Sequence, residues 1–148
     1  MNKEEIHQTV VAHLNNRIER LQAILQDTFE ATANDSKSSA GDKHETATAM
    51  AQLEQEKLTH QINEFLQLRE IISKINPSLK HTTIEHGSLV ETNNGWYYLS
   101  LGLGAVNYNN TVIFCMNPLA PIGQLLKGKK AGDSILFNDK NTSIVSVC

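Results

Sequence analysis

Residues 11–28 read VAHLNNRIERLQAILQDT, and the spacing of apolar residues in this stretch decides the fold of the first half of the chain. The seam positions recur at alternating intervals of three and four residues: Val11, Leu14, Ile18, Leu21, Leu25 and Thr28. Such alternation is typical of a coiled-coil seam on an α-helix. Helix formers without Pro or Gly surround the seam, so we predict a helix from Glu4 to about Ala33.

A second helical run follows a cluster of turn formers at residues 34–41 and extends from about Asp42 to Lys74. Its seam, interrupted by Arg69, is formed by Leu58, Ile62, Phe65 and Ile72. Two helices of roughly 30 residues joined by a short polar turn are expected to form an antiparallel coiled-coil hairpin with arms about 45 Å long. The alternative interpretation of the same pattern is a coiled coil that dimerises or that separates two domains. We expect a monomer, but pairing between chains stays open.

The composition of the 148-residue chain changes at Pro77. The residues before Pro77 include 8 Lys and Arg against 12 Asp and Glu, a net charge of −4, whereas the rest has 5 against 4, a net charge of +1. Trp96, all three Tyr and seven of the eight Gly follow Pro77. We therefore predict two domains, residues 1–76 and 77–148. The total charge of −3 argues against independent nucleic-acid binding, and no apolar run reaches the ~18–20 residues of a membrane span.

The second domain has the pattern of a small β-rich module. Asn93-Asn94-Gly95 separates two β-prone runs at residues 87–92 and 96–101, which is a strong hairpin signal. Further strands are expected at residues 111–116, 134–137 and 143–147, with Asp139-Lys140-Asn141 joining the last two. Pro121 begins one or two helical turns, over Pro121–Leu126, that end at Gly128. The fold class is therefore α+β, with an antiparallel second domain and one short helix.

No self-contained active site is evident in the sequence. Residues 123–130 match G-x-x-x-x-G-K but lack the Ser or Thr of a phosphate loop. The six His have no zinc-ligand spacing with a Glu base. Cys115 and Cys148 are expected to be reduced thiols in a cytoplasmic protein. The chain is therefore not predicted to be an enzyme in its own right.

The expected tip of the hairpin reads Gly41-Asp42-Lys43-His44-Glu45 and carries two carboxylates three residues apart. Asp at the N-cap with Glu at N3 is a capping box, which satisfies the free N–H groups of a helix start. Two carboxylates at an exposed apex are also suited to a hard cation such as Mg²⁺ when a partner supplies further ligands. Both interpretations stay open for Asp42 and Glu45.

Two segments carry a resemblance to a known family. Residues 120–133, APIGQLLKGKKAGD, resemble the C-terminal signature of the Gre family of bacterial transcript-cleavage factors: Ser-Pro, a short apolar helix, then Gly-Lys-x-x-Gly-Asp before a strand. Residues 41–49, GDKHETATA, are similar to the family's tip motif G-D-x-x-E-N-A-E-Y. The order of hairpin and β domain also agrees, so the resemblance covers nearly the whole chain.

The resemblance implies an accessory factor of bacterial RNA polymerase. Gre factors dock an FKBP-like C-terminal domain at the rim of the secondary channel, and Ala120, Pro121 and Ile122 would lie in that docking region. Their hairpin enters the channel, where Asp42 and Glu45 would help hold a second Mg²⁺ jointly with the polymerase, which cleaves its backtracked RNA. The factor has no cofactor of its own and meets RNA only within the polymerase complex. Contact with DNA is likewise indirect, and no membrane is involved.

The chain departs from the tip motif at three positions. Thr46 stands where the family has Asn, Thr48 where it has Glu, and Ala49 where it has Tyr; Ala120 replaces the Ser of Ser-Pro. Loss of supporting residues weakens a metal site by about 10- to 100-fold. A non-cleaving regulator or inhibitor that occupies the secondary channel is therefore the alternative. The FKBP-like fold alone also suggests a prolyl isomerase, for which the chain has few aromatic residues.

Overall fold

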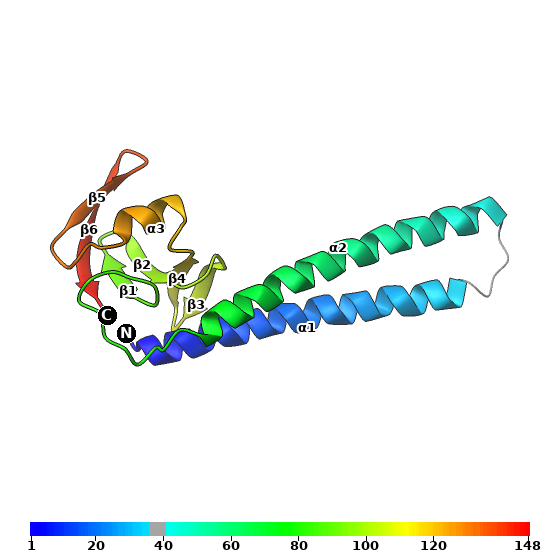
Figure 1. Ribbon diagram of the computed structural model, residues 1–148, viewed down its shortest axis with the longest axis horizontal. Coiled ribbons are helices and arrows are strands. Elements are labelled where there is room, and N and C mark those ends of the chain that lie inside the picture. The colour runs from blue at the N-terminus through cyan, green and yellow to red at the C-terminus, as the bar shows by residue number, and fades with distance from the viewer. Residues whose placement is uncertain (36–40) are drawn as a thin grey trace. The chain divides into compact units, whose positions relative to one another are not determined.

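The computed structural model describes the backbone of residues 1–35 and 41–148 and the side chains of residues 1–34 and 45–148. It has the α+β architecture expected from the sequence, with two long helices before a six-stranded sheet (Figure 1). The elements in chain order are α1 (Lys3–Asp35), α2 (Gly41–Ser73), β1 (Leu89–Thr92), β2 (Gly95–Leu99), β3 (Gly104–Tyr108), β4 (Thr111–Met116), α3 (Pro121–Leu126), β5 (Ser134–Phe137) and β6 (Lys140–Val147). Among the described residues, no helix is long and apolar enough to cross a membrane.

Contacts divide the chain into two compact units. The hairpin unit comprises residues 14–68, and the sheet unit comprises residues 1–13 together with residues 69–148. The change of composition at Pro77 therefore does not coincide with the division made by contacts. The first turns of α1 and the last turn of α2 belong with the sheet because their apolar side chains are buried there, as for Ile6, Val10 and Ile72.

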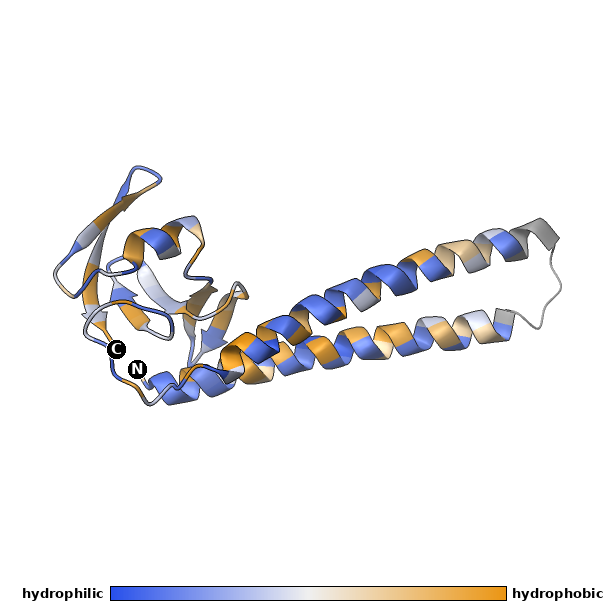
Figure 2. Cartoon of the chain, viewed as in Figure 1, coloured by the Kyte–Doolittle hydropathy of each residue, from blue (hydrophilic) through white to orange (hydrophobic). Residues whose placement is uncertain are grey.

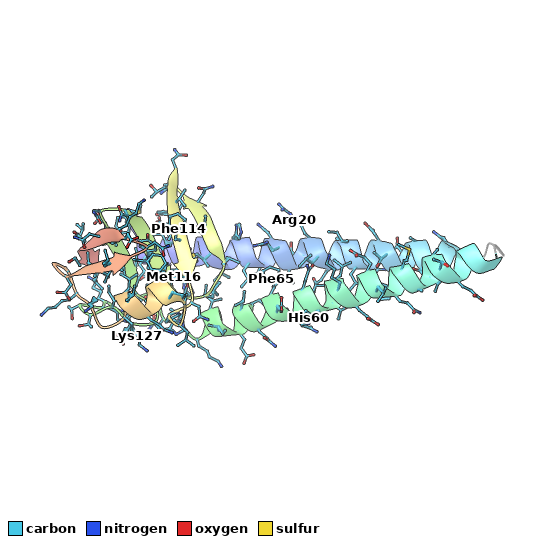
Figure 3. The ribbon with its side chains drawn as sticks, turned by 90° about the horizontal axis from the view of Figure 1, so that it is seen from above. Arg20, His60, Phe65, Phe114, Met116 and Lys127 are labelled. Atoms are coloured by element: carbon cyan, nitrogen blue, oxygen red, sulfur yellow. The ribbon has the colours of Figure 1, made fainter. Side chains whose placement is uncertain are left out.

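The hairpin unit consists of two antiparallel helices that lie side by side (Figures 1 and 3). Arg17 contacts Phe65, and further along Thr32 accepts a hydrogen bond of 3.4 Å from Gln55, so rising numbers on α1 meet falling numbers on α2. Leu14 and Ile18 on α1 and Leu58 and Ile62 on α2 are buried, as the seam predicts. The polar turn expected at residues 34–41 falls mainly outside the described residues.

The burial of seam side chains in the hairpin unit declines toward the end of α1 and the start of α2. The seam positions Leu21, Leu25 and Thr28 are only half-buried, and Ile24 and Leu53 are exposed. Hydrophobic and hydrophilic residues alternate along both helices (Figure 2). Two helices alone bury one narrow stripe each, so the apolar residues that flank the stripe stay in solvent.

The sheet has the strand order β3-β4-β2-β1-β6-β5. The predicted hairpin is confirmed: β1 and β2 are antiparallel around Asn93 and Asn94, with Leu89 opposite Tyr98. The expectation of a wholly antiparallel domain is wrong for one pair, because β2 and β4 are parallel. Strand β3 was not anticipated. Since β3 reverses the chain and pairs antiparallel with β4 at the sheet edge, β4 returns in the same direction as β2.

Two Asn-rich turns explain the remaining differences from the expected strands. Asn109 and Asn110 have positive φ of 47° and 61° between β3 and β4, and Asn138 and Asp139 have 49° and 61° between β5 and β6. Asn and Asp tolerate this left-handed conformation, which two-residue hairpin turns require. The expected connection Asp139-Lys140-Asn141 is therefore one residue too late, because Lys140 already begins β6.

The sheet carries apolar side chains on both faces. On one face, α3 contributes Leu126 to a buried cluster with Val90, Leu99 and Ile144, and Ile122 packs against it. On the other face, Tyr98 is fully buried and contacts His7 of α1. The sheet is thus a central layer between α3 and the first turns of α1 within the sheet unit (Figure 1).

Candidate functional site

The first candidate site is the pair of carboxylates at the start of α2. The helix begins at Gly41, so Asp42 and Glu45 both lie in its first turns, three residues apart. Side chains at this spacing lie on neighbouring positions of one helix surface. Glu45 is exposed, whereas the side chain of Asp42 lies outside the described residues. Because α2 already begins at Gly41, Asp42 is its second residue and does not occupy the N-cap position that the capping box expects.

The two carboxylates are the right kind of ligand for a hard cation, but they are too few to complete its coordination shell. Carboxylate oxygens are suitable ligands for Mg²⁺, which requires near-octahedral oxygen coordination. Among the described residues, no group of three or more His, Cys, Asp or Glu side chains could hold a metal ion. Two carboxylates fill only part of an octahedral shell, so a cation at Asp42 and Glu45 would need further ligands.

The second candidate site is the segment Ala120–Ile122, which leads into α3. Ala120 has an extended backbone with ψ of 154°, and Pro121 occupies the first helical turn, where its missing N–H is no loss. Ala120 and Ile122 are half-buried, and Pro121 is exposed. The predicted start of the short helix at Pro121 is confirmed, and the helix ends at Leu126, two residues before the expected end at Gly128.

Position 123 in this segment can hold only glycine, because backbone atoms lie too close to it for a side chain. A Cβ atom at this position would lie 2.5 Å from the carbonyl oxygen of Asn117 and 2.9 Å from that of Pro118. Real side chains essentially never approach backbone so closely. The glycine therefore allows α3 to pack tightly onto the loop before it, which is a requirement of the fold.

The Gly-Lys-Lys-Ala-Gly-Asp segment, residues 128–133, forms a turn between α3 and β5. Gly128 and Gly132 have positive φ of 83° and 93°. Asp133 accepts a hydrogen bond of 2.9 Å from the backbone N–H of Lys130. The glycines and Asp133 thus close the turn before β5.

The surface around α3 is both apolar and basic. Leu119 is 71% exposed and Leu125 is 40% exposed. Three exposed cations follow α3, namely Lys127, Lys129 and Lys130, of which Figure 3 labels Lys127. Among the described residues these lysines form no ion pair with a carboxylate. We call these five residues together with Pro121 the α3 surface; apolar contact with a cationic border is suited to protein docking.

A buried polar cluster, which no sequence motif indicates, joins the start of α1 to the rest of the sheet unit. The ammonium group of Lys3 donates hydrogen bonds to the carbonyl oxygens of Leu79 and Gly87. His7 Nδ1 lies 2.7 Å from the Tyr98 hydroxyl. These contacts join residues about 80 to 90 positions apart, so no local sequence pattern could reveal them.

Burial shifts the pKa values of this cluster. Burial lowers the pKa of His7, and the charge of Lys3 lowers it further. Burial also lowers the pKa of Lys3 and raises the pKa of Tyr98. Cys115 is buried, which raises the pKa of its thiol to about 12, so it stays protonated at neutral pH and is a poor nucleophile.

Comparison with solved structures gives a weak likeness. No family model matches the chain, and no curated protein matches it. A solved structure described as the transcription factor Gfh1 is 18% identical, with 94% of this chain and 93% of that chain covered, at a TM-score of 0.38. The proposals below rest on the residues of this chain and not on that likeness.

Proposed function

We propose that the chain is a Gre-like transcription elongation factor. It binds bacterial RNA polymerase in the cytoplasm, docks at the rim of the secondary channel, and brings Asp42 and Glu45 to the polymerase active site. There the two carboxylates help hold Mg²⁺ and stimulate the polymerase's own cleavage of backtracked RNA. The factor itself is not an enzyme.

One observation carries this proposal: the two motif segments occupy separate places suited to separate tasks. The tip segment begins α2, at the end of the two-helix hairpin where α1 stops, and Glu45 is exposed there. The C-terminal segment builds the α3 surface, with exposed Leu119, Leu125 and Lys127. A slender arm with carboxylates at its end can reach a recessed site, while a broader surface holds the factor in place.

The chemistry follows from the donor set. A second Mg²⁺ in a phosphoryl-transfer site stabilises the attacking and leaving oxygens. Asp42 and Glu45 supply two carboxylates and lack the remaining ligands, so the polymerase must supply the others. On this proposal the acidic pair acts only within the complex, where the polymerase completes the coordination of the cation.

The proposal is tested with backtracked elongation complexes, in which transcript length is followed after addition of the protein. We expect shortened transcripts with the wild-type chain and a loss of stimulation in the Asp42→Ala, Glu45→Ala variant. A matched control is Asp27→Ala, Glu30→Ala, because these exposed carboxylates have the same spacing on α1 of the same hairpin. Binding to polymerase is measured in parallel, and wild-type binding without any cleavage would overturn the cleavage role.

The second candidate function is a secondary-channel regulator that does not stimulate cleavage. The residues that favour it are Thr46, Thr48 and Ala49, which replace the Asn, Glu and Tyr of the tip motif. This candidate predicts that the wild-type chain slows ordinary nucleotide addition. It also predicts that Asp42→Ala leaves the inhibition unchanged, since occupation of the channel would not need a metal ligand.

A further inference from the structure

A groove of about 350 Å³ lies on the side of the hairpin unit, away from the tip segment. Helix α1 contributes Arg17, Arg20, Leu21 and Ile24, and α2 contributes Phe65 across from them. Figure 3 shows Arg20 projecting from α1, with Phe65 on the partner helix. The groove thus combines two guanidinium groups with an apolar floor, and none of the motifs described above uses it.

The two arginines have no carboxylate partner among the described residues. The Arg17 guanidinium lies 4.9 Å from the centre of the Phe65 ring, a cation–π contact that orients it. Glu64, the acidic residue of the groove, pairs instead with His60 at 3.1 Å. An oriented guanidinium with free N–H groups is well suited to bind a planar anion through two hydrogen bonds.

The surroundings favour a single protein carboxylate over a nucleic-acid backbone. Residues 14–68 contain five Lys and Arg against nine Asp and Glu, a net charge of −4, so a strand with one negative charge per nucleotide would meet more repulsion beyond the two arginines than a partner that brings one carboxylate to them. The apolar floor of Leu21, Ile24 and Phe65 suits an aliphatic or aromatic side chain. A groove of this volume is at the small end of ligand sites, which fits one or two side chains.

We infer that this groove docks an acidic segment of a protein partner. An Asp or Glu carboxylate of the partner binds between Arg17 and Arg20, and a neighbouring apolar side chain packs on Leu21 and Phe65. The identity of the partner rests on the proposed function: it is the polymerase, whose channel wall would face the side of the inserted hairpin. The groove would add a second attachment point, independent of the α3 surface and of the tip carboxylates.

The test measures the dissociation constant of the full chain for polymerase core enzyme free of nucleic acid. We expect Arg17→Ala, Arg20→Ala to weaken binding by about tenfold or more, since truncating one partner of a charge-assisted contact is costly. A control with the same change of charge is Lys74→Ala, Lys140→Ala, both exposed and outside the groove; its affinity is expected to stay within about twofold of wild type. Arg17→Lys, Arg20→Lys is expected to restore part of the binding.

Each other outcome overturns the inference in a recognisable way. If the wild-type chain binds and the Arg17→Ala, Arg20→Ala variant binds equally well, the groove has no docking role and the proposed function is untouched. If affinity falls only in complexes that carry backtracked RNA, the anion is an RNA phosphate. If the wild-type chain is a dimer that the variant breaks, the occupant is a second copy. If the wild-type chain does not bind polymerase, the groove inference fails together with the proposed function.

Discussion

The hairpin unit and the sheet unit bury their apolar side chains to very different degrees. In the sheet unit, Leu99 and Tyr98 are fully buried on opposite faces of the sheet. In the hairpin unit, Leu53 is 65% exposed and Met50 is 66% exposed. A sheet covered on both faces encloses side chains completely, whereas two helices alone enclose only the stripe between them.

This difference separates residues that serve the fold from residues available for other tasks. In the sheet unit, Gly123 is required by the nearby Asn117 carbonyl, and Asp133 closes its own turn. In the hairpin unit, Glu45, Arg17 and Arg20 are exposed. Gly123 and Asp133 are thus explained by the fold of the sheet unit, whereas these exposed charged residues of the hairpin unit are available to a partner.

The largest expected effect is on core packing. We predict that Leu99→Ala lowers the free energy of unfolding by about 2–5 kcal/mol, because it removes a fully buried side chain. The same substitution at Leu53 is expected to change it by less than about 0.5 kcal/mol. Urea denaturation checks both, with Trp96 fluorescence for the sheet unit and far-ultraviolet circular dichroism for the helices. Equal losses at the two positions would refute the contrast between the units.

A smaller effect is expected at Gly123. The Gly123→Ala variant places a Cβ against two backbone carbonyls, and we predict a loss of about 1–3 kcal/mol in the free energy of unfolding. Gly102 provides the control, since nothing lies within 4 Å of the position its Cβ would take. Thermal unfolding followed by Trp96 fluorescence distinguishes the two variants. A Gly102→Ala variant as unstable as Gly123→Ala would mean that backbone entropy, not the close approach, governs both.

The smallest predicted effect is a pH dependence confined to the sheet unit. Because burial lowers the pKa of His7 and of His81, the unfolded chain binds protons more readily than the folded one. The free energy of unfolding is therefore expected to fall as the pH drops below about 6.5, the ordinary pKa of His. His7→Gln should reduce this slope. A slope that His7→Gln leaves unchanged would exclude His7 as its source.

Much of the fold could be predicted because its signals are local. The seam spacing of Leu14, Ile18 and their neighbours predicts α1, and the turn at Asn93-Asn94-Gly95 predicts the β1–β2 hairpin. Pro121 predicts the start of α3 to the residue. Each of these patterns depends on residues that are close together in the sequence, so it can be recognised without knowledge of the tertiary structure.

The unpredicted features depend on distant residues or on weak local signals. Strand β3 has a single buried side chain, Val106, and its run of residues is short. The local signal for β3 is the Asn109-Asn110 turn that follows it. Without β3 the chain is expected to run antiparallel from β2 to β4, whereas with β3 between them in sequence β4 is parallel to β2. The Arg17–Phe65 contact and the Lys3 cluster each join segments at least 48 positions apart, which only the fold brings together.

The central claim is that the carboxylates at the start of α2 act inside the polymerase. The most direct measurement is the rate of transcript cleavage in backtracked complexes at a saturating concentration of the factor, where docking does not limit the rate. The account predicts that wild type and Asp27→Ala, Glu30→Ala accelerate cleavage equally, and that Asp42→Ala, Glu45→Ala binds the polymerase without accelerating cleavage. Full acceleration by the Asp42→Ala, Glu45→Ala variant would contradict the account and leave the two carboxylates as helix caps.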